Sequence, residues 1–317
     1  MQLEDLARWT PVRLDFSGPS PAVYWADLTS QRFVEPFLDQ TVARWASGPH
    51  ARPAVKTGLE ALVALDSEPS LDPAGMIFHL SRCGSTVVSR LLGTLPGVIV
   101  LAEPAPLNTL LGIDADRIDE ADLVAAVRAL VRALGRRRHG DERRLVLKTS
   151  SWNIRRRKIL AAAFPQTPWT WVQRDPAAVL ASLLAKPPGW LGLQAAPRQA
   201  ARRFGLDRDA VPAMTRPEFA ARALGAMLEA AAADPTARLA IDYADLPTAV
   251  WQRVAPHFGL ELDPAAVVRM RAESRLYAKD PEPRIFTGDA PRPLTDEMRD
   301  AASRFAEPGY RALCLGG

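Results

Sequence analysis

Short apolar segments alternate with helical patterns through most of this 317-residue chain, and this alternation limits the possible folds more than any other feature. The apolar segments have the length and bounding residues expected of buried strands. They cover residues 76–80, 98–102, 145–148, 169–173 and 238–243. Helical periodicity between them predicts parallel strands joined by helices. We therefore expect a three-layer α/β domain with a parallel sheet of about five strands.

The first quarter of the chain has a different pattern, because it is broken by prolines and rich in tryptophan. Residues 33–45 carry apolar side chains at helical spacing, and 59–65 suggest a second short helix. We expect residues 1–75 to form an N-terminal helical cap, followed by the α/β domain over residues 76–317. Among the predicted helices of that domain, the segments 150–164 and 217–233 end at or near a proline or a polar turn.

Composition excludes several classes of protein. Hydrophobic residues make up 48% and charged residues 24% of the chain, which is ordinary for a globular fold and argues against disorder. No run of about 18 apolar residues is present, so no membrane span is expected. The first residues lack a basic and an apolar region, so no secretory signal is expected. Cys83 and Cys314 are too few for a disulfide framework, which favours a cytoplasmic location.

The charge pattern favours a small anionic ligand over nucleic acid. Basic residues outnumber acidic ones by only four, but 35 of the 40 basic residues are arginine. Guanidinium groups suit phosphate and sulfate, whereas so small an excess does not indicate a nucleic-acid partner. The four histidines are too scattered for a zinc site, and no metal is expected. The arginine runs at 136–138 and 155–157 are expected to be solvated helix faces.

The turn after the first predicted strand is the strongest candidate for an anion site. A turn from a strand into a helix directs backbone N–H groups and the helix dipole at one point. Gly84 would allow close approach of the backbone, and the neighbouring side chains would add hydroxyl donors and one positive charge. The candidate residues are Ser81, Arg82, Cys83, Gly84, Ser85 and Thr86. A capped turn without a ligand is the alternative.

Three phosphate or sulfate chemistries compete for this turn. A nucleotide-hydrolysing P-loop needs a lysine after its last glycine, and none follows Gly84. A cysteine phosphatase loop needs five residues between cysteine and arginine, but six separate Cys83 from Arg90. Cys83 is then more simply a small buried side chain. Transfer of a sulfuryl group is the third possibility, and the rest of the chain favours it.

A second motif makes a family resemblance specific. The segment from Val172 through Arg174 and Asp175 to Ser182 resembles the 3′-phosphate motif of sulfotransferases that use 3′-phosphoadenosine 5′-phosphosulfate (PAPS). The turn at 81–86 is similar to the 5′-phosphosulfate loop of that family, with Ser81 in place of proline and Cys83 in place of serine. The resemblance covers about residues 76–260. It implies a P-loop-like fold and PAPS as the donor, which leaves as 3′-phosphoadenosine 5′-phosphate (PAP).

The resemblance also implies roles for individual residues. Arg174 and Ser182 would hold the 3′-phosphate. Glu103, at the end of the second predicted strand, matches the position of the general base. Lys148, at the end of the third, resembles the catalytic lysine of the protein-tyrosine branch. Together with Arg82 it would stabilise charge on the leaving oxygen.

Less specific features complete the expected site. Lys279 and Arg284 lie in a basic C-terminal stretch that would add contacts to the 3′-phosphate. His79 is an alternative base, although a histidine inside a strand is expected to belong to the core. Residues 186–199 would form a wall or lid of the acceptor pocket. The acceptor would be a hydroxyl or amine of a small molecule, glycan or peptide. A small-molecule kinase and a non-catalytic PAP-binding protein are the alternative functions.

Overall fold

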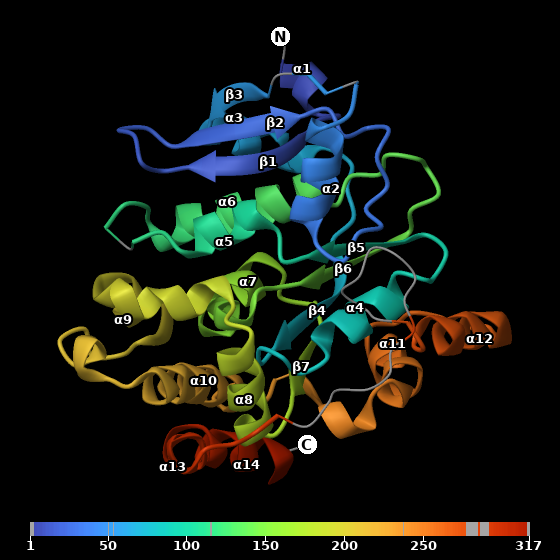
Figure 1. Cartoon of the computed structure of the whole chain (residues 1–317). Coiled ribbons are helices and arrows are strands. Elements are labelled where there is room, and N and C mark those ends of the chain that lie inside the picture. The colour runs from blue at the N-terminus through green and yellow to red at the C-terminus, as the bar shows by residue number, and fades with distance from the viewer. Residues whose placement is uncertain are drawn as a thin grey trace.

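Five parallel strands form the central sheet of the computed structural model, in the order β5-β6-β4-β7-β8 (Figure 1). The structure describes residues 3–49, 51–52, 54–114, 116–236, 238–276, 285 and 292–315. The strands are β4 (Pro73–His79), β5 (Val98–Ala102), β6 (Arg144–Lys148), β7 (Trp169–Gln173) and β8 (Arg238–Asp242). The predicted α/β class with a five-stranded parallel sheet is confirmed, and β4 begins three residues earlier than predicted.

Helices cover both faces of this sheet. Figure 1 shows α4, α11 and α12 on one side and α6, α7, α8 and α10 on the other, which gives three layers. The α-helices in this part of the chain are α4 (Ser85–Leu92), α5 (Ala105–Leu111), α6 (Glu120–Leu134), α7 (Arg157–Ala163), α8 (Pro176–Ala185), α9 (Pro197–Phe204), α10 (Arg216–Ala232), α11 (Ala255–His257), α12 (Pro264–Glu273), α13 (Asp296–Phe305) and α14 (Glu307–Leu315). A π-helical turn, Val250–Val254, precedes α11.

Two predicted segments have a different local structure. The predicted helix 150–164 begins as a 3-10 helix, η2 (Ser151–Arg156), and becomes α-helical only from Arg157. The predicted loop 186–199 contains another 3-10 helix, η3 (Gly189–Ala195), and the start of α9. Shorter 3-10 turns are η1 (Leu65–Ser67), η4 (Val211–Ala213) and η5 (Tyr243–Asp245). Proline and glycine favour such short turns over long helices.

The N-terminal part contains helices, as expected, and a sheet that the sequence did not predict. Strands β1 (Thr10–Asp15), β2 (Ala22–Ala26) and β3 (Val55–Gly58) pair antiparallel in that order. The helices are α1 (Leu3–Leu6), α2 (Leu38–Ala46) and α3 (Leu59–Ala64). Strand β3 follows β2 only after 28 intervening residues, so this pairing is non-local and leaves little signal in the sequence.

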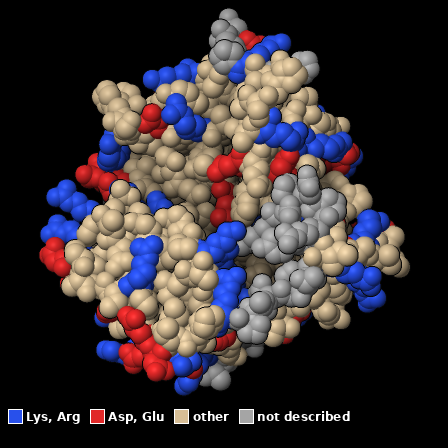
Figure 2. Space-filling model, in the orientation of Figure 1, with Lys and Arg blue, Asp and Glu red and all other residues tan. Residues whose placement is uncertain are grey.

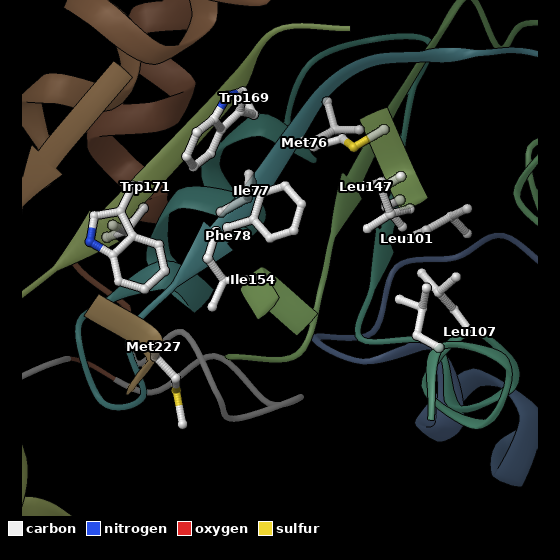
Figure 3. Packing of buried hydrophobic residues seen from close by; sticks show 14 of the residues in the cluster. Met76, Ile77, Phe78, Leu101, Leu107, Leu147, Ile154, Trp169, Trp171 and Met227 are labelled. Atoms are coloured by element: carbon white, nitrogen blue, oxygen red, sulfur yellow. The ribbon is translucent and has the colours of Figure 1, made fainter. Parts of the chain in front are cut away.

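A tightly packed core holds the carboxyl edge of the parallel sheet in place. Figure 3 shows the apolar side chains of β4 and β7, with Ile77, Phe78, Trp169 and Trp171 close together. The rings of Phe78 and Trp169 meet edge to face at 5.6 Å between centroids, and all four side chains are almost completely buried.

Within the described residues, no helix has the length and apolarity needed to cross a membrane.

Register decides which residues meet at that edge. Strand β4 pairs with β6 at Ile77–Lys148 and with β7 at His79–Val172. Strand β5 pairs with β6 so that Ala102 lies opposite Lys148. Because all five strands run in one direction, the residues that follow them converge at the carboxyl edge, where open α/β sheets bind ligands.

The contact between α10 and α13 gives a direct test of the packing. A methyl group at Gly225 on α10 would overlap the carbonyl oxygen of Phe305 at the end of α13. We expect Gly225→Ala to lower the free energy of unfolding by about 1–3 kcal/mol, as is typical of overpacking. Gly192→Ala is the control, because a methyl group there would meet no atom within 4 Å. Equal stability of both variants in urea denaturation would contradict the packing.

Candidate active site

A cavity of about 560 Å³ opens at the carboxyl edge of the parallel sheet. The predicted site residues that line it are Ser81, Arg82, Ser85, Thr86 and Glu103. In the orientation of Figure 1, Figure 2 shows a hollow near the middle of the molecular face, with acidic side chains at its edge and basic ones below it. Segments that are distant in the sequence thus meet around one cavity.

The turn after β4 leads directly into α4 through a glycine in the left-handed conformation. Gly84 has a φ of 82° and forms the N-cap of α4. A Cβ at this position would lie 2.7 Å from Leu246 and 3.0 Å from Tyr243, so glycine is required by both conformation and space. Arg82 also has a positive φ, 59°, although it carries a side chain. Strained backbone of this kind is concentrated at functional sites.

The wall of the cavity opposite this turn comes from the segment after α8, as predicted for residues 186–199. Trp190 is 4% exposed, and its indole N–H donates to Ser81 Oγ at 3.1 Å. Ser81 Oγ is also 3.0 Å from Ser151 Oγ, on the 3-10 helix after β6. The guanidinium group of Arg82 donates to the carbonyl oxygen of Lys186. These contacts tie the turn to the wall.

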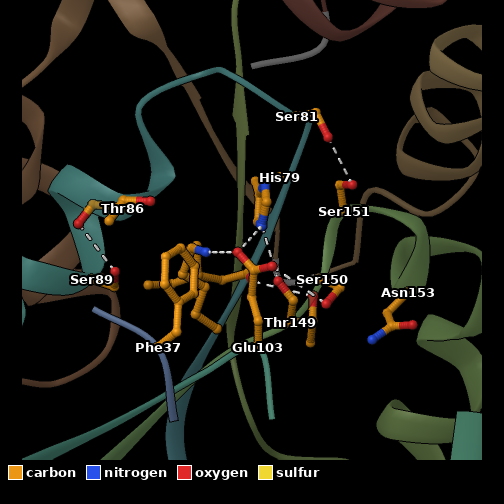
Figure 4. Close-up of polar contacts among 12 residues, drawn as sticks. Phe37, His79, Ser81, Thr86, Ser89, Glu103, Thr149, Ser150, Ser151 and Asn153 are labelled. Carbon is orange, nitrogen blue, oxygen red and sulfur yellow. Dashed lines mark hydrogen bonds and ion pairs between the residues drawn. The ribbon is translucent and has the colours of Figure 1, made fainter. Parts of the chain in front are cut away.

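Glu103, Lys148 and His79 form one polar cluster, drawn in Figure 4. Glu103 follows β5 with a φ of 51°, and its backbone N–H donates to the carbonyl oxygen of Lys148 at 2.7 Å. The Lys148 ammonium donates to Glu103 Oε1 and is only 1% exposed, whereas the Glu103 side chain is 25% exposed. His79 Nε2 lies 3.6 Å from the same carboxylate oxygen and 2.9 Å from the carbonyl oxygen of Thr149.

The cluster sets the charge state of its members. Burial by itself would raise the pKa of Glu103, but the Lys148 ammonium and His79 outweigh it and hold that pKa far below its usual range. Burial, and secondly the Lys148 charge, lower the pKa of His79. Near neutral pH the cluster therefore contains a carboxylate, an ammonium and a neutral imidazole. A carboxylate held in this ion pair is a weak base, so Glu103 needs a change at Lys148 to accept a proton well.

The N-terminal part contributes to the site in a way that the sequence did not reveal. Phe37 lines the cavity, and Lys148 Nζ lies 5.3 Å from the centre of its ring, a cation–π contact. The sequence predicted a helix from residue 33, but α2 begins only at Leu38. Pro36 disfavours helix at Glu35, and Phe37 is the N-cap of α2, extended with φ −140° and ψ 141°. Burial, and the charge of Glu103, raise the pKa of Asp39 in the first turn of α2.

The Arg174–Ser182 motif lies beside the turn at 81–86. Strands β4 and β7 are neighbours, and Leu80 N–H donates to the carbonyl oxygen of Val172 at 2.9 Å. Arg174 comes two residues later, with its guanidinium carbon 4.1 Å from the ring centre of Tyr243. Asp175 caps α8 by accepting from two backbone N–H groups, as predicted for a helix start. This places Ser182 on the second turn of that helix.

The structure adds a basic residue to this motif. Arg292 Nη1 donates to Ser182 Oγ at 3.1 Å and to the Ser182 carbonyl oxygen at 3.0 Å. Lys279 and Arg284, which the sequence predicted for this role, lie outside the described residues. A cation three residues before the Thr295 cap of α13 was the available signal, but sequence alone does not indicate which part of a basic stretch returns to α8.

Several solved sulfotransferases have structures similar to this chain. The sulfotransferase STF9 from Mycobacterium avium is 15% identical, with 81% of this chain and 80% of that chain covered and a TM-score of 0.47. The sulfotransferase from Alicyclobacillus acidocaldarius is 14% identical, with 77% and 95% covered and a TM-score of 0.44. The sulfotransferase STF1 from Mycobacterium tuberculosis H37Rv is 16% identical, with 79% of this chain and 78% of that chain covered and a TM-score of 0.44.

No family model matches the chain, and no curated protein matches it either.

The Glu103–Lys148 pair can be tested through its effect on stability. Glu103→Gln leaves a buried ammonium without its partner, so we expect the free energy of unfolding at pH 7 to fall by about 3–5 kcal/mol. The double variant Glu103→Gln/Lys148→Met removes both charges and should recover most of this loss. Urea denaturation of the wild type, of the single variants Glu103→Gln and Lys148→Met and of the double variant at one pH gives the coupling between the two residues.

The pH dependence of the same comparison has a defined sign. The pKa of Glu103 is lower in the folded than in the unfolded protein, so its stabilisation is present above the unfolded value of 4.5. It is lost as the pH falls below that value towards the folded pKa. The stability difference between wild type and Glu103→Gln should thus be smaller at about pH 4 than at neutral pH. A difference independent of pH would contradict the ion pair.

Proposed function

We propose that this protein transfers a sulfuryl group from PAPS to a hydroxyl or amine acceptor. The observation that carries the proposal is the position of three elements at one edge of the sheet. These are the glycine turn after β4, the Arg174–Ser182 motif after β7, and the Glu103–Lys148 pair after β5 and β6. Two anion-binding elements beside a base and a cation are what transfer from a doubly phosphorylated donor requires.

The donor would lie across the ends of β4 and β7. The backbone of the turn and the hydroxyls of Ser85 and Thr86 would bind the 5′-phosphosulfate. Arg174 and Ser182 would bind the 3′-phosphate, and the contact between Arg292 and Ser182 supports Arg292 as a third ligand. In this proposal Arg292 supplies the C-terminal positive charge, while roles for Lys279 and Arg284 stay predictions.

In the transfer step, a bond forms between sulfur and the acceptor oxygen or nitrogen while the bond from sulfur to the bridging oxygen breaks. PAP departs with the electron pair of that bond. Lys148 and Arg82 stabilise the charge on the departing oxygen, and Glu103 accepts the proton of the acceptor. An in-line displacement of this type depends mainly on positioning and charge stabilisation.

Because of the ion pair between Glu103 and Lys148, donor binding would precede proton transfer to Glu103. An anionic donor next to Lys148 would compete with Glu103 for the ammonium group. Weaker pairing raises the pKa of Glu103, because burial then acts without full compensation. Glu103 would become a better base when the donor is in place. His79, neutral and in contact with Glu103, would hold the carboxylate in position and is the alternative base.

A small-molecule kinase is the second candidate, since the fold and the turn also suit phosphoryl transfer. The absence of a lysine after Gly84 counts against it. We propose a cytoplasmic location from the two cysteines, and acceptors other than nucleic acid from the modest net charge.

The 3′-phosphate site predicts a preference for PAP over AMP. Arg292→Gln removes one charged contact, which should weaken PAP binding by about 1.5–3 kcal/mol and leave AMP binding unchanged. Arg299→Gln on α13 is the control, because Arg299 pairs with Asp296 on the same helix. Isothermal titration calorimetry with both nucleotides measures this. Equal affinities of the wild type for PAP and AMP would remove the main support for a PAPS enzyme.

Metal dependence separates the two candidate reactions. Charge stabilisation by Lys148 and Arg82 requires no divalent cation, so sulfuryl transfer should survive an excess of EDTA. The assay follows release of PAP from PAPS in the presence of a pool of hydroxyl and amine acceptors. Activity with ATP that EDTA abolishes and magnesium restores would favour the kinase instead.

A further inference from the structure

A second cavity, of about 300 Å³, adjoins the candidate active site, and four of its ten lining residues are arginine. Its guanidinium groups belong to Arg155 and Arg156 on η2 and to Arg202 and Arg203 near the end of α9. Arg203 and Trp152 line this cavity and the active-site cavity as well. The two spaces therefore share a wall, and the proposed function uses only one of them.

Positive charge in this cavity exceeds the negative charge around it. Asp114 is the acidic residue in its lining, and its carboxylate is already paired with Arg202 at 2.7 Å. Arg156 donates to the carbonyl oxygens of Leu111 and Ile113, both at 3.0 Å. Bonds to carbonyl oxygens satisfy the N–H groups without neutralising the charge.

Arg155, like Arg156, has its guanidinium group bonded to a backbone carbonyl oxygen, in this case that of Phe204. Glu229 is near enough to compensate part of its charge, but no ion pair between the two is found among the described residues. The run 155–157 was expected to be a solvated helix face. Arg155 and Arg156 instead donate to backbone carbonyl oxygens, and Arg157 pairs with Asp234. Holding these cations together costs free energy unless an anion joins them.

The excess of positive charge is clearest at Arg203. Its guanidinium carbon lies 4.9 Å from the ring centre of Trp152, and no ion pair of Arg203 is found in the described part of the chain. Burial, and secondly the neighbouring Arg202, lower the pKa of Arg203. A half-buried cation stacked on an aromatic ring is well placed to form bidentate hydrogen bonds to a planar or tetrahedral anion.

We propose that this cavity binds an anionic group of the acceptor, so that the substrate is an acidic molecule. This inference rests on the proposed function. The carboxylate, sulfate or phosphate of the acceptor would lie among Arg155, Arg156 and Arg203. Its hydroxyl or amine would reach past Trp152 to Glu103 in the adjoining cavity. An acceptor with no anionic group would leave the arginine cluster unneutralised.

Matched probes that differ in one anionic group test this inference. Phenol is compared with 4-hydroxybenzoate, and glucose with glucuronate and with glucose 6-phosphate, by calorimetry on the PAP-saturated protein. We expect an anionic probe to bind roughly tenfold or more tighter than its neutral partner. The ranking of carboxylate against phosphate then identifies the preferred anion.

The variant Arg203→Gln should abolish this preference and leave PAP affinity unchanged. The control is Arg198→Gln on the same helix, because Arg198 is exposed and lines neither cavity. If no anionic probe binds better than its neutral partner, or if Arg203→Gln keeps the preference, the inference is overturned while the donor site stands. If PAP itself does not bind, the proposed function fails, and with it the assignment of this cavity to an acceptor.

Discussion

The site depends on the pairing of β4 with a parallel strand on each side. This register brings the turn after β4 next to Arg174, and it places Lys148 beside Ala102, so that Glu103 follows directly at the same edge. The buried aromatic rings of β4 and β7 leave little freedom for these strands to shift. Residues that follow β4, β5 and β6 thus line one cavity, and Arg174 follows β7 at the same edge of the sheet.

Two residues at this edge of the sheet have strained backbone conformations. Arg82 and Glu103 both have positive φ values without being glycine, at a typical cost of about 1–3 kcal/mol each. The hydrogen bond from Glu103 N–H to Lys148 and the ion pair between the two side chains offset part of that cost at Glu103. The same ion pair keeps Glu103 ionised and weakly basic.

Charged side chains lie around both cavities. Basic groups of the proposed donor site lie at the ends of β4 and β7, and the arginine cluster lies beyond Trp152. The Glu103 carboxylate lines the same cavity as Arg82 and Trp152. Phe37 from the N-terminal part contacts the buried ammonium, so this part of the chain takes part in the site as well as covering the core. An anionic donor and an anionic acceptor could thus approach the same carboxylate from two sides.

The sequence alone predicted the five strands of the parallel sheet and several of the helices between them, because hydrophobic periodicity and capping residues act over a few neighbouring positions. It also predicted the turn at 81–86, Glu103 and Lys148 as ends of parallel strands that must meet at one edge. Only the tertiary structure decided the antiparallel N-terminal sheet, the place of Phe37 beside Lys148, the contact of Arg292 with Ser182, and the hydrogen bonds from Arg155 and Arg156 to distant backbone carbonyl oxygens. Each of these joins residues far apart in the chain, and local patterns carry no information on which distant partner a side chain will contact.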